Sequence, residues 1–199
     1  MDYYRIIADN FQDTIETISL SVDTLAGPLE QACQVMTRAL LEDRKIVACG
    51  AGADAALAQL FSSSLLGRFE RERPALPAMA LGADAASLTA IAVADGLGDI
   101  FSRQLRALGQ PGDVLLGISS GVDSGCLRRA IIVARDRNMG LVLLSNESDS
   151  ELSTEVAGDG VALRVRAHQP ARVVEMHTML LNCLCELIDQ SLFGSYDRE

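Results

Sequence analysis

The sequence lacks tryptophan, and aromatic residues make up only 4% of its 199 residues. A core built from this chain must therefore consist mainly of aliphatic and alanine side chains. The sequence also lacks an apolar run near the roughly 20 residues of a membrane span, and its first residues do not follow the pattern of a signal peptide. We therefore expect a cytoplasmic protein with no membrane contact.

Basic residues are scarce as well: 17 Lys and Arg stand against 27 Asp and Glu, which gives a net charge of −10. Non-specific binding to nucleic acid requires a basic surface, so direct nucleic-acid binding is not expected. The five cysteines are scattered, and the two histidines have no partner at metal-ligand spacing. We expect reduced, buried thiols and neither a metal nor another cofactor.

What the sequence does contain is a repeated alternation of short apolar runs and helical patterns. Continuous apolar runs are typical of strands buried on both faces of a parallel sheet. The alternation predicts one domain over residues 1–199, with an α/β core in residues 44–199 built as a three-layer αβα sandwich around a five-stranded parallel sheet. The strands are expected at residues 46–49, 78–81, 114–118, 140–144 and 160–165.

The first 43 residues are expected to form two helices, over residues 3–25 and 29–42, separated at Gly27-Pro28. Apolar residues in the first helix repeat at the spacing of a coiled-coil seam: Tyr4, Ala8, Phe11, Ile15, Ile18, Val22 and Leu25. This spacing favours oligomerisation helices, and the alternative is packing of the helix on its own domain.

Two loops after predicted strands resemble ligand cradles. Gly50-Ala51-Gly52 leads into a helix that carries Asp54 in its first turn, and the second loop carries Ser119, Ser120 and Ser124. Backbone N–H groups at a helix start favour a phosphate, and the serine hydroxyls could donate to it. The alternative is ordinary capping by Ser and Asp, and the carboxylate of Asp54 would repel a phosphate.

Three segments resemble the sugar isomerase (SIS) domain family, and in particular bacterial phosphoheptose isomerases. They read CGAGADAALAQLFSSSLLGRFERERPALPAMAL, RALGQPGDVLLGISS and ARVVEMHTMLLNCLCELIDQSLF. The resemblance implies a five-stranded parallel sheet between helices, assembled as a homotetramer with ligand sites at subunit interfaces. It also implies a sugar phosphate held near Ser119, Ser120, Ser124 and the position of Asp54.

The family's catalytic positions differ in this sequence. The resemblance places Ser64 where the isomerases have a general-base Glu, and Leu60 where they have a His. Val174 stands in place of a Gln, and His177 alone keeps its identity among the four positions that hold zinc or handle protons. A serine cannot act as a base near neutral pH without an activating partner, so loss of isomerase catalysis is expected. His177 by itself fits a core residue on the apolar face of a helix.

One branch of the family, the DiaA-type proteins that associate with the replication initiator DnaA, resembles this chain in having Ser at the Glu position. The resemblance implies a non-catalytic homotetramer that binds DnaA, and it extends to Leu192-Phe193, which matches a partner-binding pair. The alternative for this pair is a hydrophobic cap on the helix end. The alternative functions are isomerisation of sedoheptulose 7-phosphate and sensing of a sugar phosphate without reaction.

Overall fold

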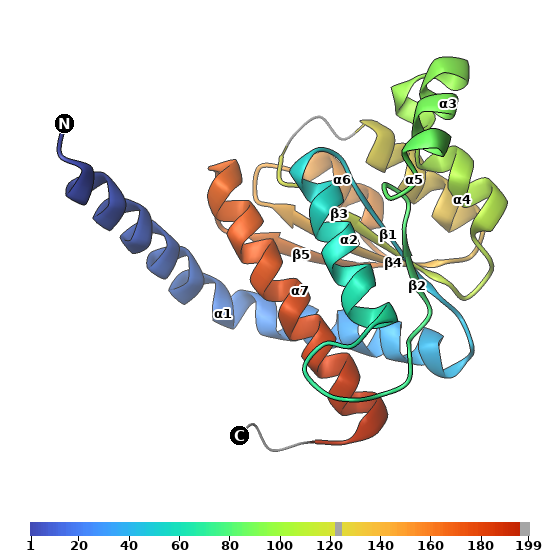
Figure 1. Cartoon of the computed structure of the whole chain (residues 1–199), viewed down its shortest axis with the longest axis horizontal. Helices are drawn as coiled ribbons and strands as arrows, with labels where there is room; N and C mark the ends of the chain where they lie inside the picture. Colours follow the sequence, from blue (N-terminus) through green and yellow to red (C-terminus); the bar gives the residue numbers. More distant parts are fainter. Residues whose placement is uncertain (122–124, 196–199) are drawn as a thin grey trace.

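The computed structural model describes residues 1–121 and 125–195. A parallel sheet lies between two layers of helices (Figure 1). Its strands are β1 (Ile46–Gly50), β2 (Ala78–Ala80), β3 (Val114–Ile118), β4 (Gly140–Asn146) and β5 (Val161–Val165), in the spatial order β2-β1-β3-β4-β5. The expected fold class, a five-stranded parallel sheet in an αβα sandwich, is confirmed.

Helices cover both faces of the sheet because the strands carry apolar side chains on both faces. One face packs against α1 (Tyr3–Leu41), α2 (Ala53–Leu66) and α7 (Pro170–Phe193), and the other against α4 (Ser102–Leu108), α5 (Gly125–Asp136) and α6 (Ser150–Val156). α3 (Ala85–Asp95) and the short 3-10 helix η1 (Leu97–Asp99) lie at the periphery. Along β1, Ile46 and Ala48 join the first core, whereas Val47 and Cys49 join the second.

The N-terminal segment forms one helix, so the prediction of two helices separated at Gly27-Pro28 is wrong. Pro28 lies inside α1, where it cannot donate the usual backbone hydrogen bond. Leu25 before it and Ala32 after it are both buried in the same core. Packing on both sides of Pro28 offsets the lost hydrogen bond and keeps the helix continuous.

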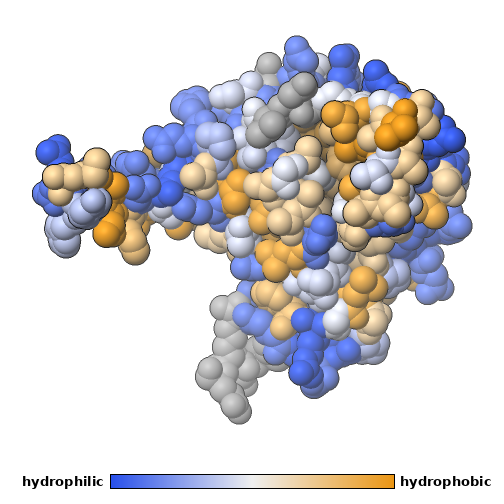
Figure 2. Space-filling view, turned by 45° about the horizontal axis from the view of Figure 1, so that its top comes forward, coloured by the Kyte–Doolittle hydropathy of each residue, from blue (hydrophilic) through white to orange (hydrophobic). Residues whose placement is uncertain are grey.

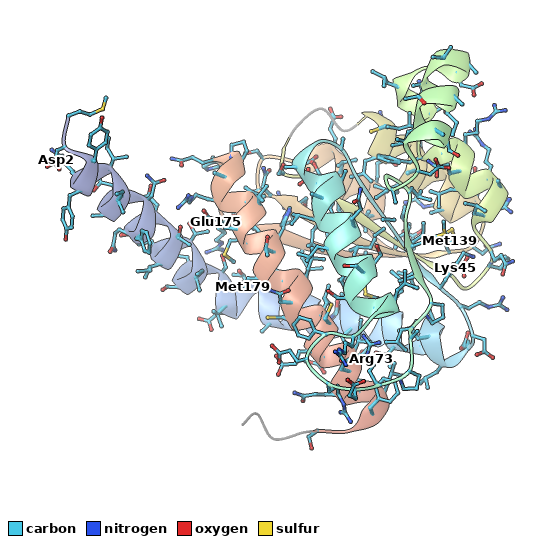
Figure 3. The ribbon with its side chains drawn as sticks, viewed as in Figure 1. Asp2, Lys45, Arg73, Met139, Glu175 and Met179 are labelled. Atoms are coloured by element: carbon cyan, nitrogen blue, oxygen red, sulfur yellow. The ribbon has the colours of Figure 1, made fainter. Side chains whose placement is uncertain are left out.

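The first half of α1 extends away from the body of the protein, with Asp2 at its far end (Figure 3). Most of the predicted seam lies on this extension: Tyr4 is 81% exposed and Phe11 69% exposed, while Leu25 is buried. Hydrophobic residues are visible on the projecting end (Figure 2). This exposure is what an oligomerisation surface requires. The homotetramer remains a prediction.

The sequence-based boundaries differ from the structure at the end of β4, which is two residues longer than expected. The acidic segment at 145–151, expected as a loop, contains the end of β4 and the start of α6, and Asp149 caps that helix by accepting from the Leu152 N–H. Within the described ranges, no helix has the length and apolar character needed to cross a membrane.

Candidate functional site

The candidate site lies where the strand order of the sheet reverses. β1 pairs with β2 on one side and with β3 on the other. From β1 the chain continues to β2 at one edge of the sheet, and from β3 it continues to β4 and β5 toward the other edge. Gly50 at the end of β1 lies opposite Ile118 at the end of β3. Ligands of open α/β sheets bind at this kind of switch point, outside the carboxyl ends of the strands. The two cradle-like loops are therefore side by side.

Glycines in the first loop allow α2 to begin directly against β1. A Cβ atom at Gly50 would lie 2.6 Å from the Cβ atom of Asp54, and Gly52 has a φ of +61°. Only glycine fits the first contact, and glycine adopts the second conformation at no steric cost. The resulting tight turn places Asp54 inside the protein, where it is only 3% exposed.

Asp54 accepts two hydrogen bonds from the second loop. Its Oδ2 atom receives the Ser120 backbone N–H at 2.8 Å and the Ser120 hydroxyl at 3.0 Å. Backbone and hydroxyl donors of this kind are the groups that would hold a phosphate. In this chain the two donors of Ser120 form hydrogen bonds to the carboxyl group of Asp54 instead.

The neighbouring serine has a carboxylate partner too. Ser119 donates its hydroxyl hydrogen bond to Asp149 Oδ2 at 2.9 Å. Asn146, at the end of β4, donates to the Ser120 carbonyl at 3.3 Å and accepts from the Asp149 N–H at 3.0 Å. Sequence reasoning missed Asp149 and Asn146, although Asn146 ends a buried strand and Asp149 follows it at the same edge of the sheet. Ser124, the third predicted serine, lies outside the described residues.

His177, on α7, contacts the end of β4. Its residue is 0% exposed, and its Nε2 atom lies 3.3 Å from the carbonyl oxygen of Ser145. Burial lowers the pKa of His177, and this outweighs the opposing effects of the Ser145 contact and the charge of Asp54. His177 is therefore a neutral core histidine near neutral pH.

The other degenerate positions are more exposed than His177. Leu60 is 41% exposed, and Ser64 and Val174 are half-buried. The Ser64 hydroxyl donates to the Leu60 carbonyl at 2.9 Å, as helix serines commonly do.

In the described part of the chain, the Ser64 side chain contacts the Leu60 carbonyl and the Cys185 thiol. The pKa of Cys185 is raised to about 12, first by burial and then by the charge of Asp189. This thiol is protonated near neutral pH. Among the residues that the structure describes, no group of three or more His, Cys, Asp and Glu could hold a metal ion.

The family follows from the comparison of the sequence with family models. The model of the SIS domain matches residues 10–146, which is more than half of the chain. The chain belongs to the SIS domain family.

Several SIS relatives align with nearly the whole chain. The phosphoheptose isomerase of Chromohalobacter salexigens is 43% identical over 195 residues, covering 98% of this chain and 99% of the relative. The solved phosphoheptose isomerase from Francisella tularensis is 35% identical with a TM-score of 0.91, covering 96% of this chain and 100% of that one. Phosphoheptose isomerase GmhA from Neisseria gonorrhoeae is 34% identical with a TM-score of 0.88, covering 94% and 98%.

These names agree with the isomerase alternative better than with initiator binding, which none of the three mentions. Binding to DnaA therefore stays a prediction from resemblance.

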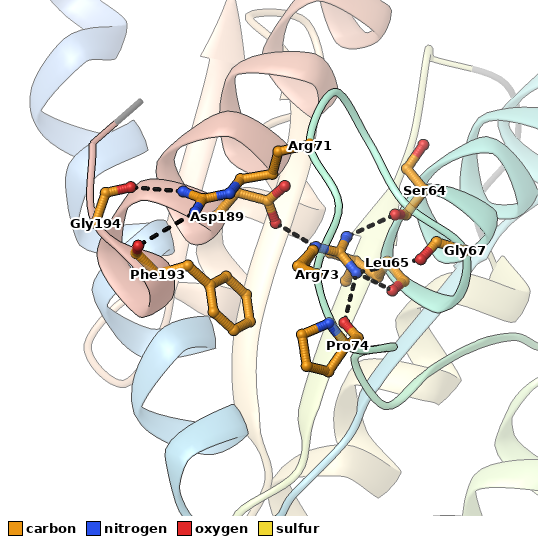
Figure 4. Close-up of polar contacts among 9 residues, drawn as sticks. All are labelled: Ser64, Leu65, Gly67, Arg71, Arg73, Pro74, Asp189, Phe193 and Gly194. Atoms are coloured by element: carbon orange, nitrogen blue, oxygen red, sulfur yellow. Dashed lines mark hydrogen bonds and ion pairs between the residues drawn. The ribbon is translucent and has the colours of Figure 1, made fainter. Parts of the chain in front are cut away.

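The predicted partner-binding pair lies at the end of α7 in this SIS domain. Leu192 and Phe193 are half-buried and pack against the core. Arg71 donates to the carbonyl oxygens of Phe193 and Gly194, at 3.3 and 2.7 Å, and its guanidinium lies 5.8 Å from the Phe193 ring centroid (Figure 4). The pair thus helps to cap the helix end and keeps part of its surface accessible.

Proposed function

We propose that this chain is a phosphoheptose isomerase homologue that does not isomerise a sugar phosphate. It acts instead as a regulatory SIS protein that binds a partner protein. The observation that carries the proposal is the contact of Asp54 with both donors of Ser120. A phosphate in the same place would have to displace a buried carboxyl group and then lie beside it. Two like charges at such short range in a poorly solvated site repel strongly.

The chemistry available at the catalytic positions supports the same proposal. An aldose–ketose isomerisation moves a proton between carbons and needs a group that is basic near neutral pH. Ser64 is engaged with a helix carbonyl, and its neighbour Cys185 holds its own proton. His177 is buried, and its Nε2 atom contacts the Ser145 carbonyl.

Isomerisation of sedoheptulose 7-phosphate is the second candidate, favoured by the 43% identity to a named isomerase across 98% of this chain. The deciding experiment incubates the purified chain with sedoheptulose 7-phosphate and follows the aldose product by NMR, with the Chromohalobacter salexigens enzyme as positive control. We expect no product above the rate without protein. Turnover near the usual enzymatic range of about 1–1,000 per second would overturn the proposal. Binding of sedoheptulose 7-phosphate without its conversion would instead favour a sugar-phosphate sensor.

For the partner, we propose a DnaA-type initiator that contacts Leu192 and Phe193, with the chain acting as a homotetramer. Symmetric copies of one binding surface raise avidity for a partner that is itself present in several copies. A pull-down with the N-terminal domain of DnaA tests this, using a Leu192→Ala, Phe193→Ala double variant. Leu97→Ala is the matched control, because Leu97 is 73% exposed elsewhere on the surface. Binding that is absent, or equal in all three proteins, would contradict the partner assignment.

A further inference from the structure

The last strand of the sheet borders a cleft that is separate from the candidate site. β5 pairs with β4, and no described strand pairs with its other, free edge. α1 passes beside β5 (Figure 1), and the two elements form the walls of a cleft with a volume of about 520 Å³. Volumes of roughly 300–1,000 Å³ are typical of ligand sites. The lining includes Thr24 and Pro28 on the helix wall, Arg164 and Arg166 on the strand wall, and Glu147.

The strand wall of the cleft carries backbone groups that no described strand pairs with. The Val165 carbonyl accepts from the Glu147 N–H at 3.1 Å, so the backbone groups of Val165 face β4. Backbone groups of successive strand residues point to opposite sides of the strand, and those of Ala162 and Arg164 therefore point to the free edge. An edge of this kind presents N–H donors and C=O acceptors with which an added strand can pair.

The helix wall of the cleft contributes an unusual acceptor. Pro28 has no N–H, so the carbonyl oxygen of Thr24 lacks the donor that a helix normally supplies four residues later. The Thr24 hydroxyl donates to the Ser21 carbonyl at 3.0 Å and does not replace that donor. The two walls thus present main-chain donors and acceptors, which are the groups that another main chain can satisfy.

Two arginines decide which charge the cleft favours. Arg164 and Arg166 are both exposed, and Arg164 donates to the Glu147 carbonyl at 2.8 Å without forming an ion pair with the described residues. Arg166 pairs with the Glu147 carboxylate at 3.2 Å, but these side chains are 49% and 43% exposed, and exposed pairs contribute little. The cleft therefore keeps a positive charge in a chain whose net charge is −10.

We propose that this cleft binds an extended, acidic segment of a partner protein, which adds to the free edge of β5 and places two carboxylates on Arg164 and Arg166. Alternate side chains of an extended chain lie on the same face, so carboxylates two residues apart match two arginines that are two residues apart. The preferred sequence is therefore acidic, any residue, acidic. The inference rests on the proposed function in that the chain binds a partner protein, but the cleft lining does not include Leu192 or Phe193.

The test titrates the full chain with dye-labelled pentapeptides and follows their fluorescence anisotropy. The probe peptide is Thr-Glu-Val-Glu-Thr with blocked ends. A first control peptide, Thr-Glu-Glu-Val-Thr, has the same composition and charge, but its adjacent carboxylates point to opposite faces. A second control peptide has Lys in place of both Glu. We expect saturable binding of the probe, at least tenfold weaker binding of the adjacent-Glu peptide, and no binding of the lysine peptide.

A double variant tests the two arginines. Arg164→Gln with Arg166→Gln removes both charges, and affinity for the probe should fall at least tenfold. Arg128→Gln with Arg129→Gln is the matched control, because it removes the same charge from two exposed arginines on α5. The control variant should bind the probe as wild type does. A circular-dichroism melt verifies the fold of both double variants.

Amide hydrogen exchange, followed by NMR, tests the main-chain pairing. The Arg164 N–H points to the free edge and should exchange more slowly when the probe is bound, because it then donates to the added strand. The Val165 N–H faces β4 and should be protected equally with and without the probe.

Each result bears on a different step of the inference. Absence of saturable probe binding overturns it and leaves the arginines as charges that protect a sheet edge from pairing. Equal affinity for the two glutamate peptides overturns the matched spacing, and equal affinity of the two double variants overturns the assignment to Arg164 and Arg166. Unchanged exchange at Arg164 overturns strand addition. Conversion of sedoheptulose 7-phosphate, measured in a separate sample, overturns the proposed function and leaves the peptide result readable.

Discussion

Two buried aspartates at opposite edges of the sheet have very different surroundings. Asp113, at the amino edge, accepts the Lys45 N–H on Oδ1 at 3.0 Å and both the Lys45 ammonium and the Gln110 N–H on Oδ2, at 2.6 and 2.8 Å. Asp54, at the carboxyl edge, receives two donors on one oxygen and none from the described residues on the other. Asp113 thus has a cation and complete pairing, and Asp54 has neither.

This difference indicates that the two edges of the sheet have different roles. A carboxylate with a cation and a donor on each oxygen fixes the local structure, because removing either partner leaves a buried group unsatisfied. A carboxylate with a free buried oxygen contributes less to stability and keeps capacity for a ligand. Asp113 at the amino edge therefore fixes local structure, and the carboxyl edge carries the candidate site.

The buried pair of Arg73 and Asp189 gives the largest expected effect on stability. Their side chains are 1% and 0% exposed and meet at 2.7 Å, and Arg73 also donates to the Ser64 and Leu65 carbonyls at the end of α2 (Figure 4). Arg73→Ala would leave Asp189 buried without its cation. We expect a loss of about 3–5 kcal/mol in the free energy of unfolding, measured by urea denaturation.

The control for this prediction is the double variant Arg73→Met, Asp189→Leu. Replacing both members of a buried pair by apolar groups costs much less than removing one member. A loss below about 1 kcal/mol in the single Arg73→Ala variant would contradict the structural role of the pair.

The next largest effect is expected at the amino edge. Asp113→Ala removes the acceptor of two backbone N–H groups and of the Lys45 ammonium. Leaving buried donors unsatisfied should cost about 2–3 kcal/mol in the same urea experiment. The exposed Asp159→Ala variant is the comparison, with an expected change within about 0.5 kcal/mol. Equal losses in both variants would contradict the structural role of Asp113.

Burial of His177 predicts a dependence of stability on pH. Because its pKa is lowered in the folded state, unfolding takes up a proton once the pH falls below the ordinary histidine pKa of about 6.5. Stability from this group is therefore present above that pH and declines on acidification, until the pH passes the lower folded-state pKa. The slope is at most about 1.4 kcal/mol per pH unit.

Urea denaturation between pH 7.5 and 5.5 measures this slope. His177→Gln should remove it, and His168→Gln should not, because His168 is exposed. A slope that is the same in wild type and in His177→Gln would assign the pH dependence to other groups.

The regular part of the fold was predictable because burial on both faces leaves a simple pattern. The run of Val114–Ile118 has the same bounds in sequence and structure. Pro28 was misread because a local rule for helix ends ignores packing. Burial of Leu25 and Ala32 on its two sides decides the matter.

The candidate site was predictable only in part. Neighbouring glycine and serine loops follow from parallel topology, and the conflict between Asp54 and a phosphate follows from charge. The partner of Ser119 could not be deduced, because Asp149 is 30 residues away and its direction depends on the start of α6. The contact of His177 Nε2 with the Ser145 carbonyl likewise joins two distant segments, and the sequence does not encode it locally.

Replacing Asp54 itself should have the smallest effect on stability and the largest on ligand preference. Asp54→Ser removes a buried carboxyl group that lacks a cation, and it leaves the Ser120 N–H and hydroxyl without their acceptor. These two changes oppose each other, so we expect the free energy of unfolding to change by less than about 1 kcal/mol. The freed donors of Ser120 should then accept an anion, and titration calorimetry should detect inorganic phosphate binding in Asp54→Ser but not in wild type. If Asp54→Ser instead destabilised the chain as strongly as Asp113→Ala, Asp54 would be a structural carboxylate like Asp113, and the functional contrast between the two edges would be lost.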